Sequence, residues 1–347
     1  MNIVGFIKDH FKQGLPFVAY RKPGAKSISA FFQETDRLFQ TDNYSESGFV
    51  FAPFDNAFPS ILIPESASEV VTEDLEYDLN PNFGLYEEFS ENSKEDHINL
   101  VTKTIHEINT TRTRKIVISR KEKVALENAD FINVFLKLLA TYRRAMVYVW
   151  YHPRVGLWIG ATPETLLKLN RQSFSTMSLA ATRPYENTLN VSWNTKELEE
   201  QSLVTDFITN KIANVSKDHK THERETVRAG NVVHLRTMIT GAIEKGGEGL
   251  SRLIKALHPT PAVCGLPREA AKQFILREEG YERKYYTGFL GEIHMQNNSE
   301  LFVNLRCMEL VDNVAFLYVG GGITAESIPE EEWEETKLKT KTLKKVL

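Results

Sequence analysis

The chain has 347 residues, of which 41 % are hydrophobic and 25 % charged, and its formal net charge is −4. This length can bury one large core or two smaller ones, and the mild acidity argues against a nucleic-acid partner, which would show as a basic excess. The chain start lacks the apolar region of a signal peptide, no apolar run reaches the ~18 residues of a membrane span, and the two cysteines have no metal-binding spacing. We therefore expect a cytoplasmic protein without a membrane partner.

The pattern of apolar residues predicts a β-rich region over residues 1–93. Two short apolar runs, Phe17–Tyr20 and Gly48–Phe54, are bounded by Gly and Pro and predict strands. The hydrophobic period then changes, and a mostly apolar stripe over residues 97–108 predicts a helix.

The remaining elements follow from the same two periods. We expect strands at residues 115–120, 145–150, 157–160, 166–169, 174–181, 232–243, 285–293, 301–308 and 314–319, and helices at 131–144, 194–214, 250–257 and 268–279. The strands come in hairpin-like clusters, without the βαβα rhythm of a doubly wound sheet, and no repeat or linker divides the chain. The pattern predicts an α+β fold of large antiparallel sheets flanked by helices, in a single domain over residues 1–347.

The C-terminal region carries the first candidate site. Gly320–Gly322 follow the last predicted strand and precede an acidic helix, in which Glu332, Glu335 and Lys339 fall on one face. That face is either an ordinary solvated surface or a pair of oxygen ligands for a hard divalent cation. In the second case, Lys339 and a glycine turn would meet an anionic substrate.

A second acidic pair, Glu197 and Glu200, has the same spacing on the helix predicted at 194–214. Two helices that each offer a carboxylate pair are a common way of building a divalent-metal site. On the residues alone, both the metal site and the solvated surface remain open.

The segment Leu257–Pro267, which reads His-Pro-Thr-Pro-Ala-Val-Cys-Gly after its leucine, resembles the signature of the chorismate-utilising enzymes in the form found in isochorismate synthases. Further segments resemble the other motifs of this family in the same order, from about Lys94 to the C-terminus. They are Lys115–Arg120, Gly160–Glu164, Ala180–Pro184, Lys196–Gln201, Tyr286–Gly288, the strand around Arg306, Gly320–Gly322 and Trp333–Lys339.

The resemblance implies an acid–base pair and a metal ion. Lys115 corresponds to the base that activates water and Glu164 to the acid that protonates the leaving C4 hydroxyl of chorismate. A free lysine titrates near ~10.4, so a base near neutral pH needs a lowered pKa, whereas Glu164 needs a raised one. The metal would be Mg²⁺, held by Glu200 and Glu335, with Glu197 and Glu332 acting through water.

The resemblance also implies a set of substrate contacts. Chorismate is a dicarboxylate, and backbone amides at glycines together with an arginine suit its carboxylates. The implied residues are Thr182, His258 as a hydrogen-bond donor, Tyr286, Arg306, Gly320, Gly322 and Lys339. Two of them have an alternative interpretation, His258 as a buried polar residue of its turn and Thr182 as a residue that only satisfies its own turn.

The nucleophile distinguishes the subfamilies. Anthranilate synthases usually have Gln at the position of Lys115 and take ammonia from a glutaminase, and aminodeoxychorismate synthases have a nucleophilic lysine at the position of Ala180. Lys115 thus favours water and isochorismate, without a glutaminase partner and with a monomer expected. A salicylate synthase, which goes on to eliminate pyruvate, is the alternative, and a non-catalytic chorismate-binding relative is a third hypothesis. Two departures from the family pattern are Gln201, where a His is common, and Ala181, where Gly is usual.

Overall fold

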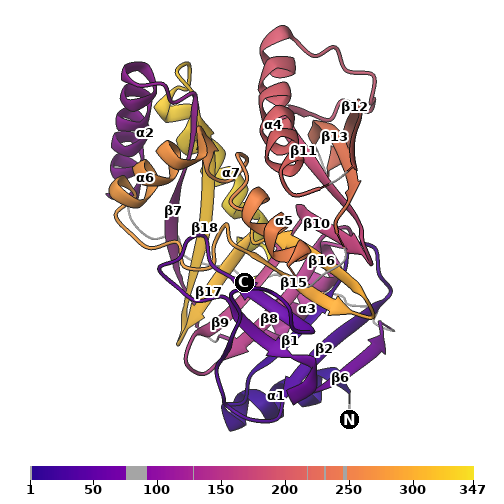
Figure 1. The fold of residues 1–347 in the computed structure, drawn as a ribbon. Helices are drawn as coiled ribbons and strands as arrows, with labels where there is room; N and C mark the ends of the chain where they lie inside the picture. The colour runs from indigo at the N-terminus through magenta and orange to yellow at the C-terminus, as the bar shows by residue number, and fades with distance from the viewer. Residues whose placement is uncertain (1, 76–91, 128, 217, 230–231, 245–247) are drawn as a thin grey trace.

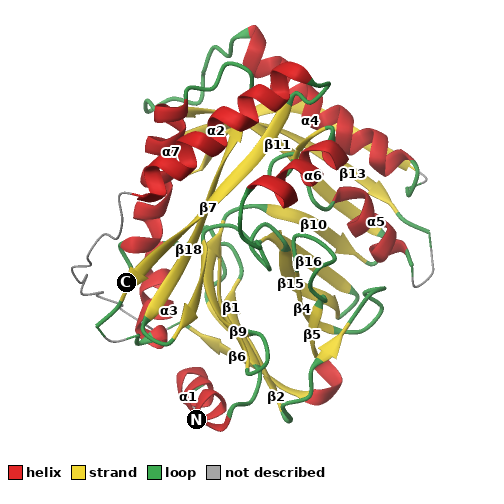
Figure 2. Cartoon of the chain, turned by 90° about the vertical axis from the view of Figure 1, so that its left-hand side faces the viewer, coloured by secondary structure: helices red, strands yellow, loops and turns green. Residues whose placement is uncertain are grey.

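The computed structural model describes the chain except for residues 1, 76–91, 128, 217, 230–231 and 245–247. It consists of two antiparallel sheets with helices around them (Figure 1, Figure 2). The predicted α+β class is confirmed, whereas the division into one domain stays a prediction. No helix in the described part of the chain is both long and apolar enough to cross a membrane.

The first sheet holds the N-terminal and C-terminal strands. Its order across the sheet is β14 (Gly265–Leu266), β7 (Lys115–Ala125), β18 (Val314–Ile323), β17 (Cys307–Val311), β9 (Gly156–Thr162), β8 (Met146–His152), β1 (Phe17–Arg21), β2 (Ser27–Gln33) and β6 (Ser68–Asp74).

The second sheet is built mainly from the middle of the chain. Its order is β12 (Asp218–Ala229), β13 (Val232–Ala242), β11 (Ser173–Pro184), β10 (Thr165–Asn170), β16 (Asn298–Val303), β15 (Phe289–Met295), β4 (Gly48–Ala52), β5 (Ile61–Pro64) and β3 (Phe39–Gln40).

The helices complete the fold. They are α1 (Ile3–Gln13), α2 (Asn92–Thr110), α3 (Phe131–Thr141), α4 (Thr195–Ala213), α5 (Gly249–Leu257), α6 (Arg268–Glu278) and α7 (Pro329–Lys344), with one 3₁₀ turn at Glu65–Ala67.

Both faces of the central strands are buried, which explains their continuous apolar runs. In β1, Phe17 and Ala19 pack with α1 and α3 on the outer face of the first sheet. Val18 and Tyr20 point the other way and join Phe51 of the second sheet in an aromatic layer between the sheets. The alternation therefore places one half of each strand in the layer shared by both sheets.

The structure corrects three expectations about elements. The strand predicted at 301–308 is two strands, because the chain leaves the second sheet after Val303 and enters the first at Cys307. Helix α1 and strand β12 were missed. Strand β12 is dominated by polar and charged residues because it is an edge strand paired only with β13. The part of the β-rich prediction that covers residues 76–91 lies outside the described residues.

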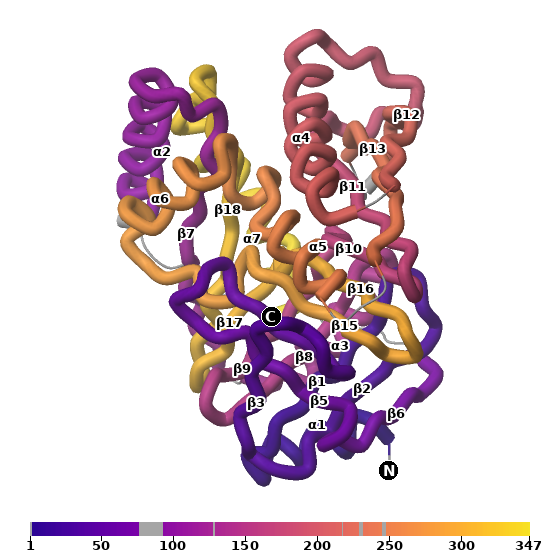
Figure 3. The backbone as a smooth tube through the Cα atoms, viewed as in Figure 1, coloured from indigo at the N-terminus to yellow at the C-terminus, as the bar shows by residue number. Residues whose placement is uncertain are grey.

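Two groups of elements rise from the sheets in Figure 1. One, which we call the β18 arm, consists of β7, β18, α2, α6 and α7, and the other, the α4 arm, consists of α4, β11, β12 and β13. Strands β7 and β18 run side by side although they lie far apart in the sequence (Figure 3). Two ion pairs bridge the arms, Lys115 with Glu200 and Lys196 with Glu326.

Candidate active site

Lys115 opens strand β7, and its side chain reaches from the β18 arm to the α4 arm. Its Nζ donates a hydrogen bond to Oε1 of Glu200 at 2.8 Å. The lysine side chain is 16 % exposed and that of Glu200 is 36 % exposed. The structure thus brings the base implied by the sequence beside one of the implied metal ligands.

Glu164 lies in the short break between β9 and β10, where its carbonyl oxygen accepts a hydrogen bond from the amide of Val303. Burial raises the pKa of its carboxyl group to about 7, and the charge of Lys115 acts in the opposite direction. The lysine is therefore within electrostatic reach. A carboxyl group with this pKa holds its proton near neutral pH, as a general acid must.

Gly320–Gly322 form part of β18 and not a turn, which corrects the sequence interpretation. They pair with residues 117–119 of β7. Each glycine leaves room for a site residue. An added Cβ on Gly322 would lie 2.7 Å from Cε of Lys115. A Cβ on Gly320 would lie 3.0 Å from the hydroxyl of Tyr286, and a Cβ on Gly321 would lie 3.2 Å from Oε2 of Glu332. The glycine run is a surface on which these three side chains lie.

The residues expected to hold an anion gather near this run. Nζ of Lys339 donates to the carbonyl oxygen of Gly320 at 2.9 Å, and Tyr286 stacks on Tyr318 at a ring distance of 5.3 Å. The Tyr286 hydroxyl makes no hydrogen bond within the described residues. Burial lowers the pKa of Arg306, and no carboxylate in the described part of the chain pairs with its guanidinium. A buried, uncompensated arginine is a site for an anion.

Thr182 lies in β11 and pairs with a histidine that sequence reasoning missed. Its Oγ1 is 2.9 Å from Nδ1 of His234. The pKa of His234 is lowered by burial and by the charges of Arg306 and Lys339, so this pair is near the expected anion site. The preceding residue, Ala181, has φ +57° at an irregularity in the strand, a conformation that favours Gly. This accounts for the glycine that is usual in the family.

His258 is placed differently from its expected role as a donor. Its Nε2 is 3.1 Å from the carbonyl oxygen of Pro53, and burial lowers its pKa to about 4, so the imidazole is neutral. Because a carbonyl only accepts, Nε2 carries the proton and Nδ1 is an acceptor. Nδ1 is buried without a partner in the described part of the chain. His258 can therefore accept a hydrogen bond from a hydroxyl group rather than donate one.

The four candidate metal ligands differ in their availability. Both carboxylate oxygens of Glu197 bind Arg183, at 2.6 and 2.5 Å, and the residue also caps α4 through Asn194. The hydrogen bonds from Arg183 lower the pKa of Glu197. Glu197 therefore stabilises the start of α4 rather than facing a metal directly.

Glu332 and Glu335 lie on α7, as the spacing predicted. Glu332 accepts a hydrogen bond from Ser327 at 2.7 Å, and its pKa is raised by burial and by the neighbouring charge of Glu335. Glu335 pairs with Lys339 at 2.6 Å. Across the described ranges, no group of three or more His, Cys, Asp and Glu residues is close enough to hold a metal ion. The donors nevertheless have the chemistry that Mg²⁺ requires, and a cation would offset the repulsion between the two carboxylates.

Gln201 anchors the helix that carries Glu200. Its Nε2 donates to Oγ of Ser178 at 2.9 Å and to Oγ1 of Thr237 at 2.8 Å. The side chain therefore fixes α4, one residue after Glu200, to strands β11 and β13.

Comparisons with known proteins agree with these motifs. The profile of the family described as "Chorismate binding enzyme" matches residues 63–347. The vibriobactin-specific isochorismate synthase of Vibrio cholerae is 28 % identical over 96 % of this chain and 85 % of its own. The isochorismate synthase MenF of Escherichia coli K12 is 31 % identical over 72 % of this chain and 59 % of its own.

Solved structures show the same fold. A Bacillus anthracis protein described as the 2,3-dihydroxybenzoate-specific isochorismate synthase DhbC superposes with a TM-score of 0.81 at 23 % identity, covering 99 % of this chain and 98 % of that one. MenF of E. coli gives the same TM-score at 19 % identity, with coverages of 100 % and 91 %. The family profile covers most of the chain, and the glycine strand, Glu164 and Lys115 lie in one site. The protein therefore belongs to the chorismate binding enzymes.

Proposed function

We propose that the protein is an isochorismate synthase, which converts chorismate to isochorismate by adding water at C2 and releasing the hydroxyl group at C4. Several relatives carry this name. The observation that supports the proposal most is that Glu164, whose pKa is raised to about 7 by burial, lies within electrostatic reach of Lys115. An acid and a base on two sides of a ring suit a reaction in which one hydroxyl enters and another leaves.

Glu164 donates its proton to the departing C4 hydroxyl in this proposal. Lys115 takes a proton from the attacking water, which it can do only as a neutral amine. In the present arrangement Lys115 is hydrogen-bonded to Glu200, so it must leave this carboxylate before it acts as a base.

One carboxylate of chorismate is held along the glycine strand. We assign the enolpyruvyl carboxylate to Arg306, Tyr286 and the backbone at Gly320 and Gly322. Thr182 and Lys339 lie beside them, and Nδ1 of His258 accepts a hydrogen bond from the C4 hydroxyl. The uncompensated charge of Arg306 supports this assignment.

We further propose that Mg²⁺ binds Glu200 and Glu335, supported by Glu332, and that it neutralises the substrate carboxylate beside it when bound. Glu197 holds the first turn of α4 in place through Arg183. In this structure Glu200 and Glu335 each pair with a lysine. The positive charge of a bound metal ion would replace the charge of these lysines.

Incubating the purified protein with chorismate and Mg²⁺ and separating the products tests the proposal. Isochorismate alone is the expected product. Salicylate with pyruvate would identify the protein as a salicylate synthase. The absence of turnover would favour the hypothesis of a non-catalytic chorismate-binding relative. Lys115→Ala and Glu164→Gln should each lower turnover by at least about 100-fold without lowering the melting temperature. Lys123→Ala, an exposed position on the same strand, is the matched control.

A further inference from the structure

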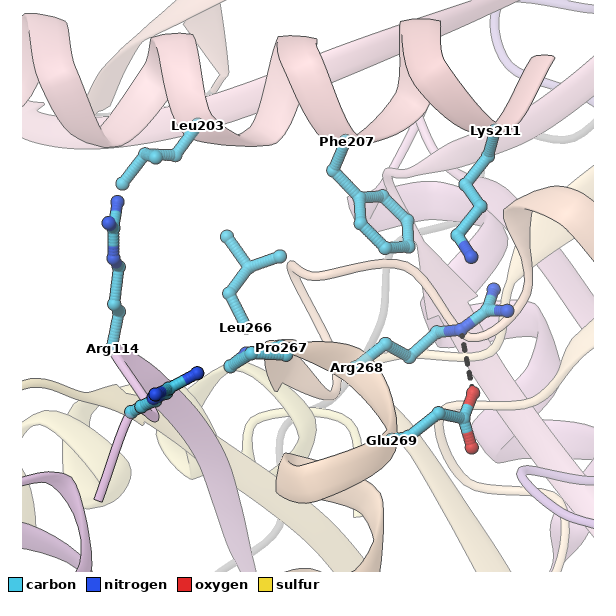
Figure 4. A pocket seen from close by; sticks show the side chains of 9 residues that line it. Arg114, Leu203, Phe207, Lys211, Leu266, Pro267, Arg268 and Glu269 are labelled. Atoms are coloured by element: carbon cyan, nitrogen blue, oxygen red, sulfur yellow. Dashed lines mark hydrogen bonds and ion pairs between the residues drawn. The ribbon is translucent and has the colours of Figure 1, made fainter. Parts of the chain in front are cut away.

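A cavity of about 390 Å³ lies between the two arms, outside the residues assigned to the substrate (Figure 4). Leu203 and Phe207 of α4 line one side, and Leu266 and Pro267 line the other. Figure 4 shows the ring of Phe207 pointing from α4 toward Leu266 and Pro267. The two walls form an apolar slot, and the volume of the cavity is enough for a ligand with a small ring.

Positive charge surrounds this slot. Arg112, Arg114, Lys211 and Arg268 contribute to its lining, against the single acid Glu269. Glu269 is 3.3 Å from Nε of Arg268. No carboxylate among the described residues pairs with the other three cations, so the cavity has a net positive charge that an anion can neutralise.

Two of these cations already lie close to the aromatic ring of Phe207 in the slot. Nζ of Lys211 lies 5.7 Å from the centre of the Phe207 ring, and the guanidinium of Arg268 lies 5.5 Å from it. An occupant that combines a flat apolar ring with a carboxylate would pack against Phe207 and bind these cations simultaneously. A bare anion would leave the apolar walls without a partner.

Each wall of the cavity is tied to a residue of the proposed active site. Leu266 pairs with Lys115 between β14 and β7, so the two side chains lie on the same face. Leu203 is three residues after Glu200 and faces the same side of α4. Nη1 of Arg268 donates to the carbonyl oxygen of His258 at 3.3 Å. An occupant therefore contacts both arms directly beside the Lys115–Glu200 ion pair.

We propose that this cavity is a regulatory site for a monocyclic aromatic carboxylate. A ligand that bridges α4 and the β14–α6 connection stabilises the arrangement in which Lys115 pairs with Glu200. In that arrangement Lys115 is held against Glu200 and away from the attacking water, so the ligand inhibits turnover. The inhibition rests on the proposed isochorismate synthase activity, whereas the binding site itself does not.

Calorimetric titration of the full chain with benzoate tests the site without any turnover. Saturable binding of benzoate is expected, with benzamide, which lacks the charge, and inorganic phosphate, which lacks the ring, binding at least about tenfold more weakly. Arg112→Gln and Lys211→Gln should each weaken benzoate binding by about tenfold. Lys255→Gln, an exposed lysine on α5 outside the cavity, should leave it unchanged.

Three results would overturn the proposal: no saturable binding, equal binding of benzamide or phosphate, or loss of binding in Arg306→Gln but not in Lys211→Gln. The last would place benzoate in the substrate site. In the activity assay, benzoate should lower kcat without raising KM for chorismate, and Lys211→Gln should relieve the effect. Purely competitive inhibition would contradict the regulatory role. A protein that binds benzoate through Lys211 but makes no isochorismate would keep this site and reject only the proposed function.

Discussion

Gly322 and Lys115 are in such close contact that a Cβ on the glycine would lie 2.7 Å from Cε of the lysine. The glycine belongs to β18 and the lysine opens β7. The missing side chain lets the lysine cross the neighbouring strand toward Glu200. The position of the proposed base therefore depends on a residue that has no functional group.

Gly322→Ala is expected to lower kcat by about 100-fold, because a shift of about 1 Å in a catalytic group costs that much. The methyl group would displace a flexible side chain, so the melting temperature should change little. Gly321→Ala is the control. Its Cβ would meet only the carboxylate end of Glu332, at 3.2 Å. Equal losses in the two variants, measured as kcat with chorismate, would contradict a specific role for Gly322.

The raised pKa of Glu164 predicts the pH dependence of the reaction. The acid is protonated below about pH 7, so kcat/KM should fall about tenfold per pH unit above that value. In Glu164→Gln, the remaining activity should lack this decline. A wild-type profile that stays flat from pH 6 to about 9 would exclude Glu164 as the acid that determines the rate.

The same group affects stability. The carboxyl titrates near 4.5 in the unfolded chain and near 7 in the folded protein, so the folded state binds more protons between these values. The free energy of unfolding therefore falls as pH rises through this window. Urea unfolding should show the wild type losing stability relative to Glu164→Gln between about pH 5 and pH 7.

Much of the site could be predicted because its residues lie in short, ordered motifs. The spacing of Glu332 and Glu335 predicted their common helix, but the last strand was predicted to end at Val319, before the three glycines that it includes. What each residue contacts was not predictable. Lys115 and Glu200 are 85 residues apart, and only the packing of the two arms brings them together.

The pattern of apolar residues also fails to predict the bounds of a strand where the backbone changes direction. The segment from Leu301 to Met308 is apolar enough to be one strand, yet Arg306 has φ +49° where the chain crosses between the sheets. A strand pattern reports burial and not which sheet provides it. The contact of His234 with Thr182 was missed for a similar reason, because the two residues lie on different strands.

The proposed metal ligands give a prediction that does not depend on turnover. Glu335→Gln should weaken Mg²⁺ binding by more than about tenfold, since a neutral amide replaces a charged oxygen ligand. Glu334→Gln is the matched control, because Glu334 is exposed on the same helix and pairs with Lys337. Calorimetry with Mg²⁺ alone measures both affinities. Equal affinities in the two variants would remove Glu335 from the metal site.

Arg283 joins three of the segments that form the site. Its guanidinium donates to the carbonyl oxygens of Val117 at 2.7 Å and Val263 at 2.9 Å, and to Oγ1 of Thr287 at 3.1 Å. It also pairs with Glu279, and the two side chains are only 2 % and 1 % exposed. The pair thus fixes the strand of Lys115 to the segment before Cys264.

Replacing Arg283 with Met should lower the free energy of unfolding by about 3–5 kcal/mol, because the buried Glu279 would lose its cationic partner and keep only its hydrogen bonds from Ser119. Adding Glu279→Gln should recover part of this loss, since the two residues interact directly. The Arg277–Glu278 pair at the end of α6, in which the Arg277 side chain is 57 % exposed, is the comparison, and Arg277→Met should cost less than about 1 kcal/mol. Urea unfolding measures the wild type and four variants, namely these three and Glu279→Gln alone. If the double variant were as unstable as the sum of the two single changes, Arg283 would stabilise the strand through its carbonyl contacts and not through Glu279.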